Sequence, residues 1–144
     1  MIRKAVSKDL PTLVELACRL WSDHRVEEMR AEFAKIIAKP DAAFFLAYAE
    51  ENAIGFAQCQ LRRDYVEGTD SSPVGYLEGI YVVEGCRGQG IARKLLSECE
   101  KWAKEKGCLE FASDCELDNI HSLQFHRNAG FEEANRIICF TKKL

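Results

Sequence analysis

Apolar residues recur at three- and four-residue spacing in the first quarter of the chain, and this spacing predicts two helices. The first covers residues 7–21, with Ser7 as its N-cap, and the second covers residues 25–38. Further along, the stretch after a glycine-rich turn is typical of a helix that ends near Gly107. Residues 119–130 are typical of a last helix that ends on a glycine.

Runs of apolar, β-branched and aromatic residues lie between the helices and predict strands. Two of these runs flank Glu51-Asn52 and are read as a hairpin. The expected strands cover residues 2–5, 42–50, 53–65, 74–83, 108–114 and 136–144. Within 74–83, simple alternation predicts one face with Tyr76, Glu78, Ile80 and Val82 and the other with Leu77, Gly79, Tyr81 and Val83.

The order of these elements predicts the α/β (α+β) class. Strands alternate with helices in the second half, whereas the hairpin in the first half requires antiparallel pairing. A chain of 144 residues is long enough for one domain with a real core. We therefore expect a single domain over residues 1–144, built on one mixed central β-sheet flanked by about four helices.

Composition narrows the class of protein. Seven cysteines without a C-x-x-C pair argue for reduced thiols in the cytoplasm and against a disulfide framework or a metal site. A net charge of −3 gives no general attraction to nucleic acid. No apolar run approaches the roughly 20 residues of a membrane helix, and the N-terminus lacks the apolar stretch of a signal peptide.

The stretch Glu84-Gly-Cys-Arg-Gly-Gln-Gly-Ile-Ala-Arg93 joins a predicted strand to a predicted helix. Glycines at such a turn leave backbone N–H groups free, and the helix dipole adds positive charge, so the turn suits an anion such as phosphate. The alternative is a tight turn with solvated basic residues. A nucleotide P-loop is absent, and Gly88-x-Gly90 lacks the third glycine of a dinucleotide fingerprint.

Two motifs carry a resemblance to a known superfamily. Arg87-Gly-Gln-Gly90-Ile-Ala92 resembles the (Q/R)-x-x-G-x-(G/A) motif of the GNAT N-acetyltransferases, which use acetyl-CoA. Asn119, Ser122, His126, Gly130 and Phe131 resemble the second GNAT motif. The resemblance covers nearly the whole chain and implies the GNAT fold. It also implies an acetyl-CoA site formed by Ile80, Tyr81, Val82, Arg87, Gly88, Gln89, Gly90, Ile91, Ala92, Arg93 and Asn119.

Within this site the resemblance assigns separate parts of the cofactor. Backbone N–H groups from Gly88 to about Arg93 would hold the pyrophosphate, and Asn119 would bond the pantetheine arm. The strand around Ile80 to Val82 would pair with that arm and offer an N–H to the thioester oxygen, where a fixed donor helps most in the transition state.

Acidic residues recur where an acceptor of the acetyl group should lie. Glu78 interrupts an apolar strand, Asp114 ends the next strand, and residues 64–70 hold further acids. A partly desolvated carboxylate has a raised pKa and suits a general base, and a cluster of acids suits a polycationic amine. The alternatives remain open: Asp114 as a helix or turn cap, Glu78 paired with an arginine, and the loop acids as solvated residues.

A closer resemblance points to the aminoglycoside 6'-N-acetyltransferases, a resistance family within GNAT. It rests on DYVEGTDSSPV at residues 64–74, LEGIYV at residues 77–82, and the matching positions of Trp21, His24 and Asp114. It implies an aminoglycoside pocket lined by Trp21, His24, Tyr65, Glu78 and Asp114. The chain has Asn135 where relatives carry a further pocket acid, which places one contact with a drug amine in question.

The resemblance implies direct attack of the acceptor amine on acetyl-CoA in a ternary complex. Glu78 acting through water is the preferred base, and Asp114 would hold the ammonium groups of the substrate. His126 stands where many relatives have a tyrosine acid, and it is either that acid or a helix residue without a catalytic part. Cys86 matches no nucleophile arrangement.

Three other functions stay open at this point: acetylation of a polyamine, small metabolite or protein lysine; a non-catalytic acetyl-CoA-binding module; and a nucleotide-binding or nucleic-acid protein. Because small relatives often dimerise, a homodimer is expected. The predicted strand over residues 136–144 would pair across subunits through its edge.

Overall fold

The computed structural model describes residues 1–144 and contains a single mixed sheet with four α-helices, as the sequence predicts, but the sheet has five strands and not the six expected. The helices are α1 (Leu10–Leu20), α2 (Val26–Ile37), α3 (Ile91–Glu105) and α4 (Ile120–Asn128). The strands are β1 (Ile2–Lys4), β2 (Ala42–Ala49), β3 (Asn52–Arg62), β4 (Val74–Val82) and β5 (Phe111–Ser113). Short 3₁₀ turns at Ser7–Asp9 and Glu84–Cys86 precede α1 and α3.

The strands follow one another across the sheet in chain order. β1 to β4 pair antiparallel, whereas β5 runs parallel to β4 through three residue pairs from Gly75–Phe111 to Leu77–Ser113. Because β4 continues to Val82, it extends past the last of these pairs. The two strands therefore separate at Glu78.

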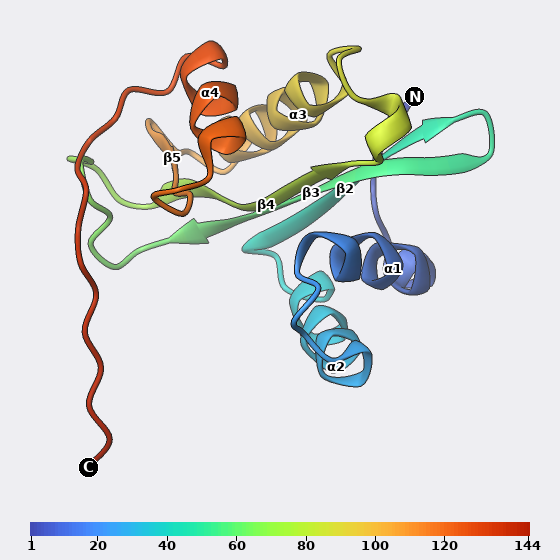
Figure 1. Cartoon of the computed structure of the whole chain (residues 1–144). Coiled ribbons are helices and arrows are strands. Elements are labelled where there is room, and N and C mark those ends of the chain that lie inside the picture. The colour runs from blue at the N-terminus through green and yellow to red at the C-terminus, as the bar shows by residue number, and fades with distance from the viewer.

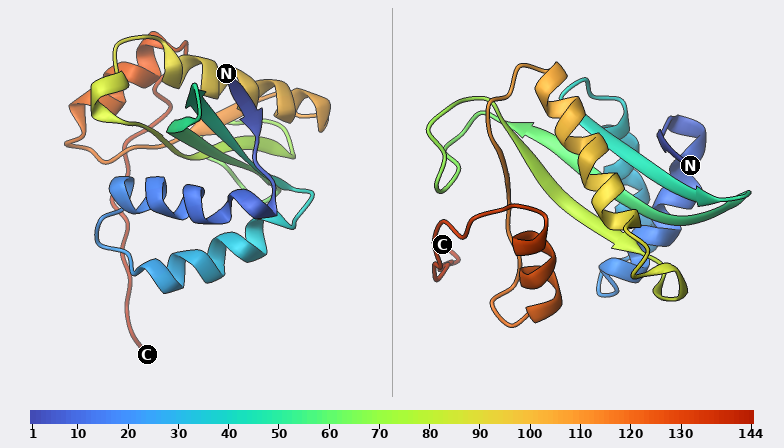
Figure 2. Two further views of the ribbon diagram at one scale, coloured as in Figure 1. Left: turned by 90° about the vertical axis from the view of Figure 1, so that its right-hand side faces the viewer. Right: turned by 90° about the horizontal axis from the view of Figure 1, so that it is seen from above.

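Helices cover both faces of the sheet, with α1 and α2 on one side and α3 and α4 on the other (Figures 1 and 2). β2 contributes to both layers by alternation. Phe44 and Leu46 pack in the cluster with α1 and α2, and Phe45 and Ala47 pack in the cluster with α3. This double coverage explains why residues Ala42 to Ala47 are all buried.

A β-bulge in β4 overturns the predicted alternation of this strand. Gln58 pairs with Gly79 and Cys59 pairs with Leu77, so Glu78 is an extra residue without a partner on β3. Leu77, Ile80 and Val82 consequently share the α3 side, and Tyr81 packs with the α1 and α2 cluster. The expected common face of Tyr76, Glu78, Ile80 and Val82 is wrong, because one inserted residue reverses the alternation beyond it.

The start of the first helix also differs from the prediction. Ser7 opens the 3₁₀ turn, and the Asp9 carboxylate accepts a hydrogen bond from the Val6 N–H at 2.8 Å. Arg3 also holds this carboxylate, because its two guanidinium nitrogens each lie 2.8 Å from an Asp9 oxygen.

The predicted strands near the C-terminus are shorter or absent. β5 contains only Phe111–Ser113 of the expected 108–114, and no strand forms over residues 136–144. The apolar pattern of the last segment favours extended backbone, but a strand also needs a hydrogen-bonding neighbour. The segment instead leaves the body of the molecule (Figure 1) and exposes its large apolar side chains, including Ile138 and Phe140.

None of the helices is both long and apolar enough to cross a bilayer.

Candidate active site

The separation of β4 from β5 creates the centre of the candidate site. Beyond Leu77, the edge of β4 that faced β5 has no strand beside it. An extended segment with free backbone groups can pair with an extended ligand as an added strand does. Ile80, Tyr81 and Val82, the residues expected to contact the pantetheine arm, lie on this part of β4.

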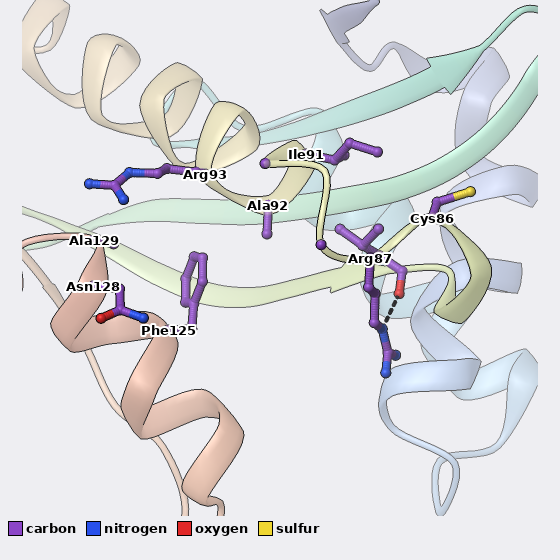
Figure 3. A pocket seen from close by; sticks show the side chains of 11 residues that line it. Cys86, Arg87, Ile91, Ala92, Arg93, Phe125, Asn128 and Ala129 are labelled. Carbon is purple, nitrogen blue, oxygen red and sulfur yellow. Dashed lines mark hydrogen bonds between the residues drawn. The ribbon is translucent and has the colours of Figure 1, made fainter.

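A cleft lies next to this edge, where the glycine-rich turn enters α3 (Figure 3). Gly88 and Gly90 adopt left-handed backbone conformations, with φ of 79° and 77°, and a side chain is strained in such a conformation. The turn leads into the N-terminus of a 15-residue helix, whose dipole favours an anion. The cleft is lined by Val82, Cys86, Arg87, Gly88, Gly90, Ile91, Ala92, Arg93, Phe125, Asn128 and Ala129.

Most of the residues predicted to hold acetyl-CoA line this cleft, but four do not: Ile80, Tyr81, Gln89 and Asn119. Asn119 Oδ1 accepts a hydrogen bond from the Ser122 N–H at 3.1 Å, and Asn119 so caps the start of α4. Its side-chain oxygen is therefore already engaged, and only its NH₂ group is free for the predicted bond to pantetheine.

Arg87 lines the cleft but is tied to the strand. Its Nε donates to the Val82 carbonyl at 2.8 Å, as Figure 3 shows. Its guanidinium also lies 5.5 Å from the centre of the Tyr81 ring. Arg87 thus braces the turn against the end of β4 through its Nε. The backbone N–H groups of the turn and the basic side chains that line the cleft are suited to a pyrophosphate.

Three residues of α4 and its C-terminal end line the cleft, and the sequence analysis did not predict them. Phe125, Asn128 and Ala129 face it from the opposite side to α3 (Figure 3). They recur at positions i, i+3 and i+4 and so share one helix face. That spacing was visible in the sequence once residues 119–130 were assigned to a helix.

Glu78, at the bulge of β4, is paired with an arginine of the neighbouring strand. Arg62 Nε and Nη2 lie 3.0 and 2.8 Å from Glu78 Oε1, and Nη2 lies 2.9 Å from Oε2. Burial raises the pKa of the Glu78 carboxyl, and the Asp114 charge adds to this, while the Arg62 bonds oppose it. The net direction is upward, as the sequence analysis expects for a base.

Asp114 follows β5 and is held by a buried tyrosine. The Tyr76 hydroxyl donates a hydrogen bond to Asp114 Oδ2. Burial is the main cause of a raised pKa for Tyr76, and the bond to Asp114 adds to it, so the phenol remains a donor. The capping alternative for Asp114 finds no support in the hydrogen bonds of α4, whose cap is Asn119.

Trp21 lies close to the bulge from the other layer. A Cβ added at Gly79 would meet the Trp21 ring at 2.5 Å, so the indole packs directly on the backbone next to Glu78. The His24 ring centre lies 6.4 Å from that of Trp21. The structure thus brings the two predicted residues of the α1–α2 connection to the same region as Glu78.

Tyr65 and Asn135 form a second group with Glu67. The Tyr65 hydroxyl donates to Glu67 Oε2 at 3.1 Å, and Asn135 Nδ2 donates to Glu67 Oε1 at 3.0 Å. The Tyr65 side chain is 80% exposed on the loop between β3 and β4. Glu67 therefore places a carboxylate beside Asn135, the position at which this chain lacks an acid.

His126 lies where β4 and β5 part. Its Nε2 is 2.8 Å from the hydroxyl of Ser113, the last residue of β5, and its Nδ1 is 2.7 Å from the Ser122 carbonyl. Rings of Phe125 and Phe131 pack around the imidazole. The predicted catalytic residue His126 is thus held by contacts on both of its ring nitrogens.

Comparison with known proteins identifies the family to which the chain belongs. The profile of the acetyltransferase (GNAT) family matches residues 10–131. The aminoglycoside N(6')-acetyltransferase type 1 of Acinetobacter haemolyticus is 41% identical over 99% of this chain and 98% of its own length. The enzyme of that name from Serratia marcescens is 40% identical, with 94% of each chain covered.

Solved structures give the same result. The structure of AAC(6')-Iy in complex with the bisubstrate analogue CoA-S-monomethyl-acetylneamine has a TM-score of 0.96 and 38% identity, covering 100% of this chain and 98% of that one. The apo crystal structure of AAC(6')-IG from Acinetobacter haemolyticus has a TM-score of 0.95 and 40% identity, covering 100% and 99%. The chain belongs to the GNAT family of acetyltransferases and, within it, to the aminoglycoside 6'-N-acetyltransferases.

Proposed function

We propose that this enzyme transfers the acetyl group of acetyl-CoA to the 6'-amino group of aminoglycoside antibiotics and thereby confers resistance on its host. One observation carries the proposal: Glu78 and Asp114 lie at the point where β4 and β5 separate, on the same side of the sheet edge as a glycine-rich turn whose geometry suits an anion. An anionic cofactor carrier and a cationic acceptor can therefore meet at this point.

Acetyl-CoA, when bound, supplies a thioester that an amine can attack. Backbone N–H groups at Gly88 to Arg93 bind its pyrophosphate, and the free edge of β4 around Ile80 to Val82 aligns its pantetheine arm. The strand edge and the helix N-terminus are fixed before the ligand arrives, so little conformational entropy is lost on binding.

The acceptor side is formed by carboxylates and aromatic rings. Asp114 binds the ammonium groups of the drug, and Glu78, acting through water, removes the proton that an ammonium must lose before attack. Trp21, His24 and Tyr65 line the pocket. Glu67, which lies beside Asn135, makes the contact with a drug amine that a further acid would make at position 135. His126 supplies a proton to the departing thiolate.

We also infer the cellular location and the oligomeric state of the enzyme. Residues 1–144 form a single acetyltransferase domain in the cytoplasm, a location supported by seven cysteines that are all unpaired. Two chains form a homodimer. The support for this is the apolar C-terminal segment, whose Ile138 and Phe140 side chains are 81% and 88% exposed, together with β5, which ends the sheet with one edge free.

The first experiment follows free thiol release from acetyl-CoA with four acceptors: tobramycin, a kanamycin analogue with hydroxyl at 6', spermidine, and a lysine peptide. We expect turnover with tobramycin and none with the 6'-hydroxyl analogue. Turnover only with spermidine or the peptide would retain acetyl transfer but replace the substrate. Binding of acetyl-CoA without any turnover would contradict an enzymatic function.

The base is tested by Glu78→Gln, which keeps the shape of the side chain but cannot accept a proton. We expect kcat to fall by roughly 10²- to 10⁴-fold, the usual contribution of a general base. Calorimetric titration with acetyl-CoA checks that the cofactor site is unchanged. Full activity of this variant across pH would remove Glu78 from the role.

A further inference from the structure

Arg62, the last residue of β3, occupies a central place between the two carboxylates of the site. Its guanidinium makes three hydrogen bonds of 2.8 to 3.0 Å to Glu78 and lies 3.4 Å from the centre of the Tyr76 ring. Tyr76 in turn donates to Asp114. One cation therefore links both acids, one directly and the other through the tyrosine on which it stacks.

The geometry is specific to arginine. A planar guanidinium can bond two carboxylate oxygens and stack on an aromatic ring at the same time, which a lysine ammonium cannot do. The pair is also sheltered, since only 19% of the Glu78 side chain and 37% of the Arg62 side chain are exposed. Because Glu78 is largely buried, this contact affects its charge more than a fully exposed ion pair would.

The other groups that face Glu78 do not replace this cation. Asp114, at the end of β5, repels a charge on Glu78, and Gln60 of β3 and the Tyr76 ring of β4 are neutral. His24, near Trp21, pairs with Asp23 at 3.2 Å. Without Arg62, burial and Asp114 together would raise the pKa of Glu78 further.

We propose that Arg62 is a positioning residue for acetyl transfer: it fixes the orientation of the Glu78 carboxylate and compensates its charge, and so leaves Asp114 as the acid that receives the incoming ammonium. The inference rests on the proposed function. The contacts of Glu78 and Asp114 indicate different roles for these two acids. Glu78 has its charge compensated within the protein, whereas Asp114 accepts only from a neutral hydroxyl and still attracts a cation.

The test compares Arg62→Met and Arg62→Lys with Arg63→Met. Arg63 is the adjacent residue and is paired on the surface with Asp41 at 2.7 Å, so it is a matched control outside the site. The pH dependence of kcat/KM is measured with one aminoglycoside for all variants. In Arg62→Met the acidic limb should move to higher pH by about one unit, the lower range for a carboxylate that loses an arginine neighbour.

Arg62→Lys should give a smaller displacement in the same direction, because it restores charge but not the two-pronged contact. Arg63→Met should match the wild type. A structural role alone would lower activity and thermal stability in Arg62→Met without moving the limb, and that result would overturn the proposal. If Arg62→Met does not fold, the Arg62→Lys profile decides the question.

A second measurement does not depend on turnover. In protein labelled with ¹³C at glutamate carboxyl carbons, the Glu78 signal is assigned from its loss in Glu78→Gln, and its titration midpoint is followed by NMR. The midpoint should rise in Arg62→Met and stay unchanged in Arg63→Met. A rise in an enzyme without aminoglycoside activity would support the effect of Arg62 on Glu78 and reject only the substrate. An unchanged midpoint would reject the role of Arg62 whatever the substrate.

Discussion

The two hydrogen bonds of His126 determine which of its ring nitrogens carries a proton. A carbonyl oxygen can only accept, so the nitrogen that faces Ser122, Nδ1, must be protonated. In the neutral ring Nε2 is then an acceptor, and the Ser113 hydroxyl donates to it. His126 can release a proton from Nε2 only as the imidazolium, which is a stricter condition than the sequence motif suggests.

The acid role of His126 therefore predicts a pH-dependent loss in His126→Phe, a variant whose ring still packs between Phe125 and Phe131. The ratio of wild-type to variant kcat should grow as the pH falls, because only the imidazolium can release a proton from Nε2. Thiol release measured from pH 5.5 to 8.5 gives this ratio. A ratio that stays constant over the range would leave His126 with a packing role only.

At the scale of elements, the glycine turn before α3 shows how backbone conformation prepares a binding site. Gly88 and Gly90 both have positive φ, and no atom lies within 4 Å of a Cβ built on either residue. Space would thus admit a side chain, but the left-handed conformation disfavours it by about 1 to 2 kcal/mol. The requirement for glycine at these positions comes from the path of the backbone.

We accordingly expect Gly90→Ala to weaken acetyl-CoA binding by about tenfold, because the free turn relaxes and binding must restore the strained conformation. Gly107→Ala is the matched control. Gly107 follows the same helix at its other end, has φ of 88°, and is equally open. Both variants should lose similar stability in thermal unfolding. Only Gly90→Ala should change the calorimetric Kd for CoA, and equal Kd values would show that the turn does not hold the cofactor.

The elements that sequence predicts well are those whose signal is local. α1 to α3 follow from apolar spacing, and the glycine turn follows from residues adjacent in the chain. The bulge at Glu78 could not be predicted, because it depends on how β4 registers against β3. The Arg62–Glu78 pair depends on the same register between residues 16 positions apart. The last strand was predicted from a local pattern that carries no information about a partner strand.

At the scale of the whole molecule, the N-terminal segment is anchored by one charged network. Arg3 on the edge strand β1 bonds both oxygens of Asp9 and the Tyr48 hydroxyl on β2. The Arg3 bonds are the main cause that lowers the pKa of Asp9, from 3.8 to about 2. A carboxyl with a lowered pKa stabilises the folded state above its unfolded pKa, and this contribution is lost as the pH falls toward 2.

Asp9→Asn should therefore lower the free energy of unfolding by about 1 to 2 kcal/mol at pH 7, allowing for partial screening of Arg3 by water. The difference from the wild type should shrink between pH 4 and pH 2. Urea unfolding at fixed protein concentration measures both quantities. Asp41→Asn, which breaks the exposed pair with Arg63, should change stability little at either pH. An equal effect of the two substitutions would contradict a special role for Asp9.

The C-terminal segment gives the prediction that concerns assembly. In an extended segment Ile138 and Phe140 lie on one face and Thr141 on the other, so a partner that covers the apolar face buries both large side chains. Replacing Ile138 and Phe140 by Asp should convert a dimer to a monomer, because two charges would be buried without partners. Thr141→Asp adds a charge to the opposite face and should remain dimeric. Light scattering coupled to size exclusion gives the masses directly, and a monomeric wild type at micromolar concentration would exclude the homodimer.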